Sequence, residues 1–174
     1  MTARYAERRA PRVVGTLLEG PCARMPWYTD LRAVFGVLGG REREFDWLVT
    51  DLECVPFPPE LSPEKEAQLF SGEALSDLVR GQSVPTQLIW AVLTGFERGT
   101  SPDLSNLCLL PGADGNSDLW PGEPRIQYPR AVVELVCWDS SATMLITSDS
   151  DLTARFRAGF PEAVDLATSA RARR

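Results

Sequence analysis

Four carboxylates are spaced so that they could act together as a divalent-metal site or an acid–base pair. Asp51 and Glu53 are two residues apart, so an extended strand would present both on one face. Glu134 interrupts the otherwise apolar run Ala131–Trp138, and Asp139 directly follows that run. If the two segments are neighbouring strands, the four side chains offer the oxygen ligands that hard cations prefer. The structural alternative leaves Asp51 and Glu53 at a solvated strand end and pairs Glu134 with an arginine.

A nuclease-type arrangement of these acids is excluded by the residues that follow them. The PD-(D/E)xK pattern needs a lysine two residues after its second acid. Here Cys54 and Val55 follow Glu53, and the only lysine in the chain is Lys65. A metal-dependent hydrolase would therefore have to use the four carboxylates without that lysine.

A second acidic motif, Asp114–Asp118, matches the first five positions of an EF-hand calcium loop, D-x-N-x-D. The match then ends, because Leu119 stands where the loop needs glycine. Arg125 stands where the loop needs a bidentate glutamate. Since Asp, Asn and Gly are also turn formers, the motif indicates a polar turn.

The chain contains no histidine, which removes the commonest general base and the commonest zinc ligand. Ser-His-Asp, Cys-His and histidine–metal mechanisms are therefore excluded within this chain. Its four cysteines are far apart and form no CxxC pair, which favours buried free thiols over a disulfide or a metal site. No cofactor is predicted. These cysteines are Cys22, Cys54, Cys108 and Cys137.

Charge is distributed unevenly along the chain. Residues 13–170 hold 11 basic and 23 acidic side chains, whereas residues 1–12 and 171–174 each carry a net charge of +3. An acidic body repels nucleic acid over most of its surface, and it suits either a basic protein partner or simply solubility. No basic stripe and no glycine-rich phosphate loop is present, so nucleic-acid binding is not predicted.

The segment 97–125 is rich in Gly, Pro, Asp, Ser and Asn, and long irregular segments in compact domains are usually functional or disordered. Trp120 within it either anchors a partner or packs the loop onto the core. The other four tryptophans fall in periodic apolar patterns and are predicted to be core. The residues expected to contact a partner are Asp51, Glu53, Asp103, Asp114, Asp118, Trp120 and Glu123.

The apolar periodicity predicts an α+β fold with a mixed, largely antiparallel sheet of five to six strands covered by helices. We expect a loosely held arm over residues 1–12, one domain over 13–166 with the loop 97–125, and a basic tail over 167–174. Predicted strands are Arg12–Leu18, Phe45–Val55, Gln87–Phe96, Asn106–Leu110, Ala131–Trp138 and Thr143–Thr147. Predicted helices are Trp27–Leu38, 61–70, 73–79 and one capped by Ser148 that ends at Gly159.

Two segments, FDWLVTDLECVPFP (45–58) and CWDSSATMLITSDSDLTARFRAGFPEAVDL (137–166), resemble small cytoplasmic bacterial proteins of the immunity type, which neutralise a secreted toxin. The resemblance implies a non-enzymatic inhibitor that covers a basic active-site cleft with its acidic surface, and it carries over no individual functional residue. The alternatives are the metal-dependent hydrolase described above and an accessory subunit of a larger assembly.

The expected compartment is the cytoplasm. No apolar run approaches the roughly 20 residues of a membrane helix, and the first residues lack the apolar core of a secretory signal. The sequence predicts no membrane association, and it leaves the oligomeric state open.

Overall fold

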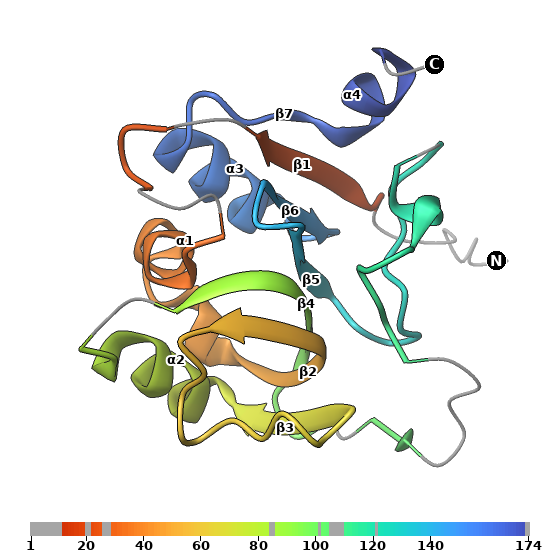
Figure 1. Cartoon of the computed structure of the whole chain (residues 1–174). Helices are drawn as coiled ribbons and strands as arrows, with labels where there is room; N and C mark the ends of the chain where they lie inside the picture. Colours follow the sequence, from red (N-terminus) through yellow and green to blue (C-terminus); the bar gives the residue numbers. More distant parts are fainter. Residues whose placement is uncertain are drawn as a thin grey trace, which may run out of the picture.

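The computed structural model describes residues 12–19, 22–25, 29–83, 86–100, 102–104, 110–120 and 122–172. Within these ranges seven strands form one open sheet in the order β3-β2-β4-β5-β6-β1-β7, and every ladder between them is antiparallel (Figure 1). The strands are β1 Val14–Glu19, β2 Phe45–Val55, β3 Ala67–Ser71, β4 Gln87–Glu97, β5 Val133–Trp138, β6 Ala142–Thr147 and β7 Val164–Asp165. The helices are α1 Leu31–Leu38, α2 Gly72–Gly81, α3 Ser150–Gly159 and α4 Leu166–Ala172, with short 3₁₀ segments η1 Arg41–Glu44 and η3 Ser117–Leu119.

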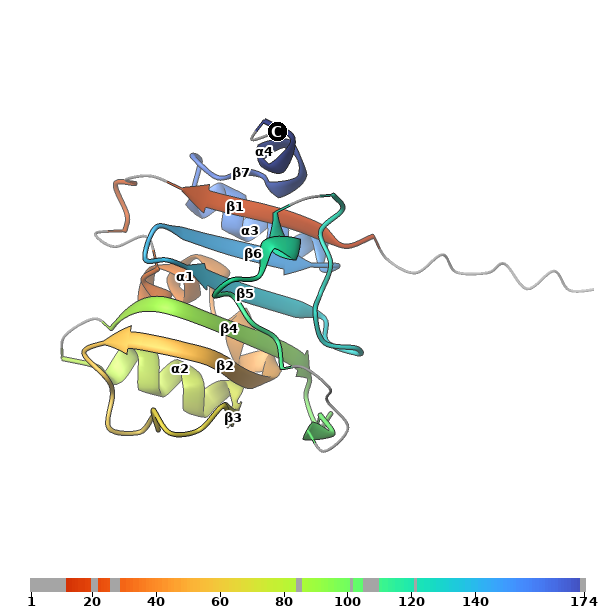
Figure 2. The same ribbon diagram turned by 45° about the vertical axis from the view of Figure 1, so that its right-hand side comes forward.

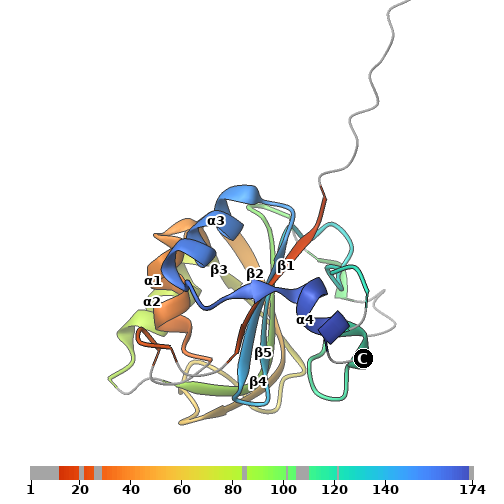
Figure 3. The ribbon, with the colours of Figure 1, turned by 90° about the horizontal axis from the view of Figure 1, so that it is seen from above.

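The sheet is covered on both faces, as the view from above shows (Figure 3). Helices α1, α2 and α3 pack on one side, which we call the helix face. Residues 110–120 and 122–131 and α4 cover the other side, which we call the loop face (Figure 2). Burial separates the same two layers: Trp47, Leu93 and Leu135 pack with the helices, whereas Val92 and Val136 pack under the loop.

The α+β class and the single domain are confirmed, but the predicted count of five to six strands is wrong. One missed strand is β3, which lies in the segment assigned to a helix opened by Ser62. The side chain of Gln68 accepts a hydrogen bond from the Ser62 amide at 2.9 Å and donates to the Ser62 carbonyl at 3.1 Å. These bonds close a turn, and residues 67–71 then pair with β2 instead of continuing a helix. The other missed strand, β7, has only two residues.

Two helix starts differ from the prediction by the residue that caps them. Asp30 caps α1 by accepting the Arg32 amide at 2.8 Å, so the helix begins at Leu31, and the predicted start at residues 26 and 27 lies outside the described residues. Asp149, not Ser148, caps α3, because its carboxylate accepts two amides of the first turn. The predicted helix over 73–79 is confirmed as α2.

The C-terminal segment assigned to a tail begins with α4, which Leu166 anchors in the loop-face core with 2% of its surface exposed. Gly15 of β1 leaves room for the Leu166 side chain because glycine has no Cβ atom. A Cβ atom at Gly15 would lie 2.8 Å from Leu166 Cδ2 and 2.9 Å from Pro124 Cγ. Residues 106–109 of the predicted strand 106–110, most of the N-terminal arm and Cys108 fall outside the described residues, and Leu110 itself lies outside any strand.

Candidate partner-binding face

The alternation of side chains along β2 is interrupted by a bulge at Asp51, and this places two predicted site residues on the loop face. Asp51 has a φ of 50°, and the pairing of β2 with β4 shifts register between Thr50 and Glu53. Simple alternation would put Asp51 and Glu53 on the side of Trp47, which faces the helices. The bulge instead turns Leu52 to the helix face and both carboxylates to the loop face, as bulges commonly re-aim side chains.

The Asp51 carboxylate holds the acidic turn of the loop in place. Its Oδ2 atom accepts the amide of Ala113 at 2.6 Å and the amide of Asp114 at 2.7 Å. Next to it, the Thr50 hydroxyl donates to the Pro111 carbonyl at 2.6 Å. These bonds fix the turn over β2 and leave the Asp114 side chain exposed.

Two open hollows flank this turn, and both are acidic. The first is lined by Asp51, Glu64, Glu66 and Asp114, with Lys65 as its cation. The second is lined by Asp118, Glu123, Arg125, Asn116 and Gln127, with Asn116 capping η3 through the Asp118 amide at 3.1 Å. Sequence reasoning missed Glu64 and Glu66 because it placed them in a helix. The acidic run 60–66 was the signal that could have found them.

Three partly exposed tryptophans lie together on the same face. The Trp138 ring makes an edge-to-face contact with Trp90 at a centroid distance of 5.0 Å and with Trp120 at 5.1 Å. Trp120 packs the loop onto the sheet, as one of its two interpretations predicted, and its role as a partner anchor stays a prediction. Glu53 is the register partner of Trp90, so its carboxylate borders this tryptophan cluster.

We call the combined surface the acidic loop face. It consists of the tryptophan cluster (Trp90, Trp120 and Trp138) and seven carboxylates, with two cations, Lys65 and Arg125, among them. The carboxylates are Asp51, Glu53, Glu64, Glu66, Asp114, Asp118 and Glu123.

The structure thus brings together six of the seven residues that the sequence assigned to partner contact; Asp103 is the exception. Its carbonyl accepts the Tyr128 hydroxyl at 3.4 Å, and the neighbouring Leu104 packs with Phe96, near the end of β4. Two views show residues 102–104 well apart from η3 (Figures 1 and 2). Asp103 therefore does not contribute to the acidic loop face.

The four carboxylates of the metal-site alternative do not converge. Glu134 is wholly buried, whereas Asp139 is exposed in the β5–β6 turn at the far end of the same strand, with a φ of 47°. Across the described residues, no group of three or more Cys, Asp or Glu side chains is arranged to hold a metal ion. The calcium-like motif 114–118 forms a turn followed by η3.

Glu134 instead fixes the segment that covers the loop face by accepting hydrogen bonds from it. Its Oε1 atom accepts the Gln127 amide at 3.0 Å, the Tyr128 amide at 3.3 Å and the Thr94 hydroxyl at 3.3 Å. Burial raises the pKa of this carboxyl to about 7, and the hydrogen bonds oppose part of that rise. The partners of Glu134 are therefore loop amides and a threonine, in place of the arginine that the structural alternative expected.

The cysteines that the structure describes are free, as predicted. Cys54 and Cys137 are buried, and Cys22 is partly buried. Burial raises the pKa of Cys54 to about 11 and that of Cys137 to about 12. Both side chains are therefore neutral thiols near pH 7, which makes them poor nucleophiles and metal ligands.

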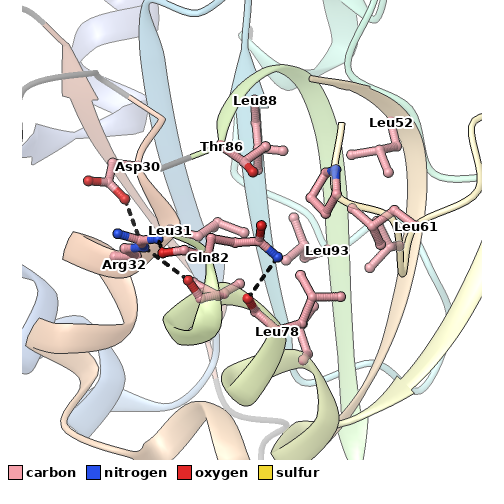
Figure 4. Close-up of a pocket in the computed structure, with 14 residues that line it drawn as sticks. Asp30, Leu31, Arg32, Leu52, Leu61, Leu78, Gln82, Thr86, Leu88 and Leu93 are labelled. Atoms are coloured by element: carbon pink, nitrogen blue, oxygen red, sulfur yellow. Dashed lines mark hydrogen bonds between the residues drawn. The ribbon is translucent and has the colours of Figure 1, made fainter. Parts of the chain in front are cut away.

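An apolar crevice opens on the helix face between α1, α2 and the sheet (Figure 4). Leu52, Leu75 and Leu78 contribute to its walls, and Arg32 at its rim donates to the Val79 carbonyl at 3.0 Å. Its free volume is about 40 Å³, well below the ~150 Å³ of a cavity that takes up benzene. The crevice is a gap in packing too narrow for a small-molecule ligand.

No protein-family model matches the chain, and no curated protein or solved structure shows significant similarity to it. None of the helices built from the described residues has the length and apolar character needed to span a bilayer.

Proposed function

We propose that this protein is a cytoplasmic, non-enzymatic binding protein of the immunity type, which neutralises a basic toxin or effector by covering it with the acidic loop face. The observation that carries the proposal is the composition of that face, where two hollows together with Glu53 present seven carboxylates and two cations, and three partly exposed tryptophans lie on the same side of the sheet. Acidic rims accelerate encounter with a basic partner, and aromatic side chains supply the short-range binding energy.

The hydrogen bonds beneath the acidic loop face also suit a binding surface. Asp51 and Glu134 each fix the loop by accepting two backbone amides. A loop that is already ordered loses less conformational freedom when a partner binds, so more of the contact energy appears as affinity. Asp114 and Asp118 on this loop are exposed.

An accessory subunit would instead be expected to expose a sizeable apolar patch. The large apolar side chains exposed among the described residues are Val55, Leu69 and Val164. Leu69 lies on β3 and Val164 on β7, the two opposite edges of the sheet, so they do not form one patch. The structure therefore gives this alternative no support.

The test is co-purification of the tagged protein from its own host at low and at high salt, followed by identification of bound proteins. We expect a stoichiometric basic partner that high salt releases. The double variant Asp118→Asn with Glu123→Gln should weaken capture at least tenfold. The control Glu73→Gln with Asp77→Asn removes two charges from α2 on the opposite face and should change capture less than twofold.

Two results would overturn the proposal. One is that no basic protein is enriched under either salt condition. The other is that the loop-face variant and the α2 control capture the partner equally well, because the charge of the acidic loop face would then have no role in binding.

A further inference from the structure

The tryptophan cluster has the features of a receptor for a single cationic side chain. Trp90 and Trp138 come from neighbouring strands, β4 and β5, and Trp120 comes from the loop that crosses them. The ring planes stand at 76° for Trp90 and Trp138 and at 86° for Trp120 and Trp138. In each pair the edge of one ring therefore meets the face of the other. Two of its members lie on strands of the sheet, and all three keep part of their surface in solvent.

A carboxylate lies beside the cluster. Glu53 is the register partner of Trp90 on the neighbouring strand, and the pairing of β2 with β4 shifts on both sides of Glu53. The bulge at Asp51 is what turns Glu53 to this face. In the part of the chain that the structure describes, no hydrogen bond or ion pair occupies the Glu53 carboxylate, and the residue is exposed.

Indole rings attract cations through their negative faces, and tryptophan does so most strongly among the aromatic residues. The carboxylate of Glu53, on the strand next to Trp90, adds an opposite charge on the same face. Arginine fits this pair better than lysine, because its planar group stacks on an aromatic ring, is weakly hydrated and can bond a carboxylate through two N–H groups.

We propose that Trp90, Trp138 and Trp120 together with Glu53 form a binding site for an arginine side chain of the basic partner. The inference deepens the proposed function and rests on it, because it names a group through which the acidic loop face would hold the partner.

The test uses the full-length protein and two probe peptides of equal charge, hexa-arginine and hexa-lysine, with binding followed by tryptophan fluorescence and by the indole N–H signals in NMR spectra. Both peptides should bind the acidic loop face, and hexa-arginine should bind roughly threefold to tenfold more tightly, as expected for a cation–π contact. The indole signals of the cluster should shift more with arginine than with lysine.

Two variants distinguish arginine binding at the tryptophan cluster from attraction by the overall charge of the acidic loop face. Trp90→Leu should abolish the preference for arginine and leave the affinity for hexa-lysine within twofold of the original. Glu53→Gln keeps the tryptophans and is exposed, so it tests the same site even if Trp90→Leu lowers stability; it should reduce the preference by at least half. The variant Asp118→Asn should weaken both peptides equally.

Equal affinities of the two peptides for the unaltered protein would refute the arginine site, as would an arginine preference that both Trp90→Leu and Glu53→Gln retain. Such a result leaves the proposed function standing if the host partner is still lost with the Asp118→Asn and Glu123→Gln variant. Conversely, an arginine preference without any basic partner in the co-purification would refute the immunity-type function alone.

Discussion

Replacing Glu134 by glutamine should make the protein less sensitive to alkaline pH. Glu134 is wholly buried, and burial raises its pKa in the folded state from 4.5 to about 7. The folded protein therefore binds this proton more tightly than the unfolded chain does. The stabilisation that comes from the protonated form is complete below pH 4.5, declines as the pH rises, and is lost above pH 7.

The size of the effect follows from the two pKa values. A change from 4.5 to about 7 corresponds to about 3 kcal/mol of folding free energy between pH 4.5 and pH 8. Glu134→Gln keeps an oxygen that can accept the Gln127 and Tyr128 amides but removes the titrating group. Any fixed difference in packing between the two side chains is independent of pH, so it does not alter the expected slope.

The measurement is the free energy of unfolding in urea for both proteins at pH 5, 6, 7 and 8. The stability of Glu134→Gln minus that of the unaltered protein should increase by roughly 2–3 kcal/mol over this range, with most of the increase below pH 7. Glu53→Gln, the same substitution at an exposed position, is the control. A Glu134→Gln difference that stays flat with pH would refute the reasoning, because the buried carboxyl would then titrate alike in both states.

Three substitutions test the packing. Gly159→Ala should destabilise the protein, because the new Cβ would lie 2.3 Å from Val37 Cγ1, and overpacking costs about 1–3 kcal/mol. Gly36→Ala, in an exposed helical position with no atom within 4 Å, should instead stabilise by up to about 1 kcal/mol; equal effects of the two in thermal unfolding would contradict the packing at Gly159. Thr16→Val should raise the melting temperature by about 2–4 °C, because the buried Thr16 hydroxyl has no hydrogen-bond partner among the described residues; an unchanged or lower melting temperature would show that the hydroxyl is satisfied.

The parts of the fold that local rules determine were predictable from the sequence. The strand Phe45–Val55, the central strand from Gln87 and the β5–β6 hairpin all have apolar patterns that agree with their turn residues, and the structure confirms them. Strand β3 was not predictable by the same means. Its residues carry a plausible helix start at Ser62, and only the pairing with β2 and the Gln68 side chain, both tertiary contacts, decide against it.

The candidate site was predictable in composition but not in position. The sequence named Asp51 and Glu53 as neighbours on one face, and the structure agrees, but simple alternation points them at the helices. A bulge with positive φ at Asp51 turns both side chains to the loop face instead. Such a bulge has no distinctive residue pattern here, because aspartate adopts left-handed backbone only occasionally and alternation gives no hint of an extra residue.

The carboxylates that the sequence grouped as possible metal ligands serve different purposes, and the loop layer explains why. An irregular segment that covers a sheet carries backbone amides with no ladder to pair them, and buried amides need acceptors. Glu134 and Asp51 supply those acceptors from the sheet below. A buried acid on a strand under such a loop thus accepts hydrogen bonds from the backbone amides of the loop. The acids on the loop itself, such as Asp118, are exposed. If the outward acids bind the partner, their positions depend on the inward ones. Loss of the Asp51 carboxylate should therefore weaken binding more than its single surface charge accounts for.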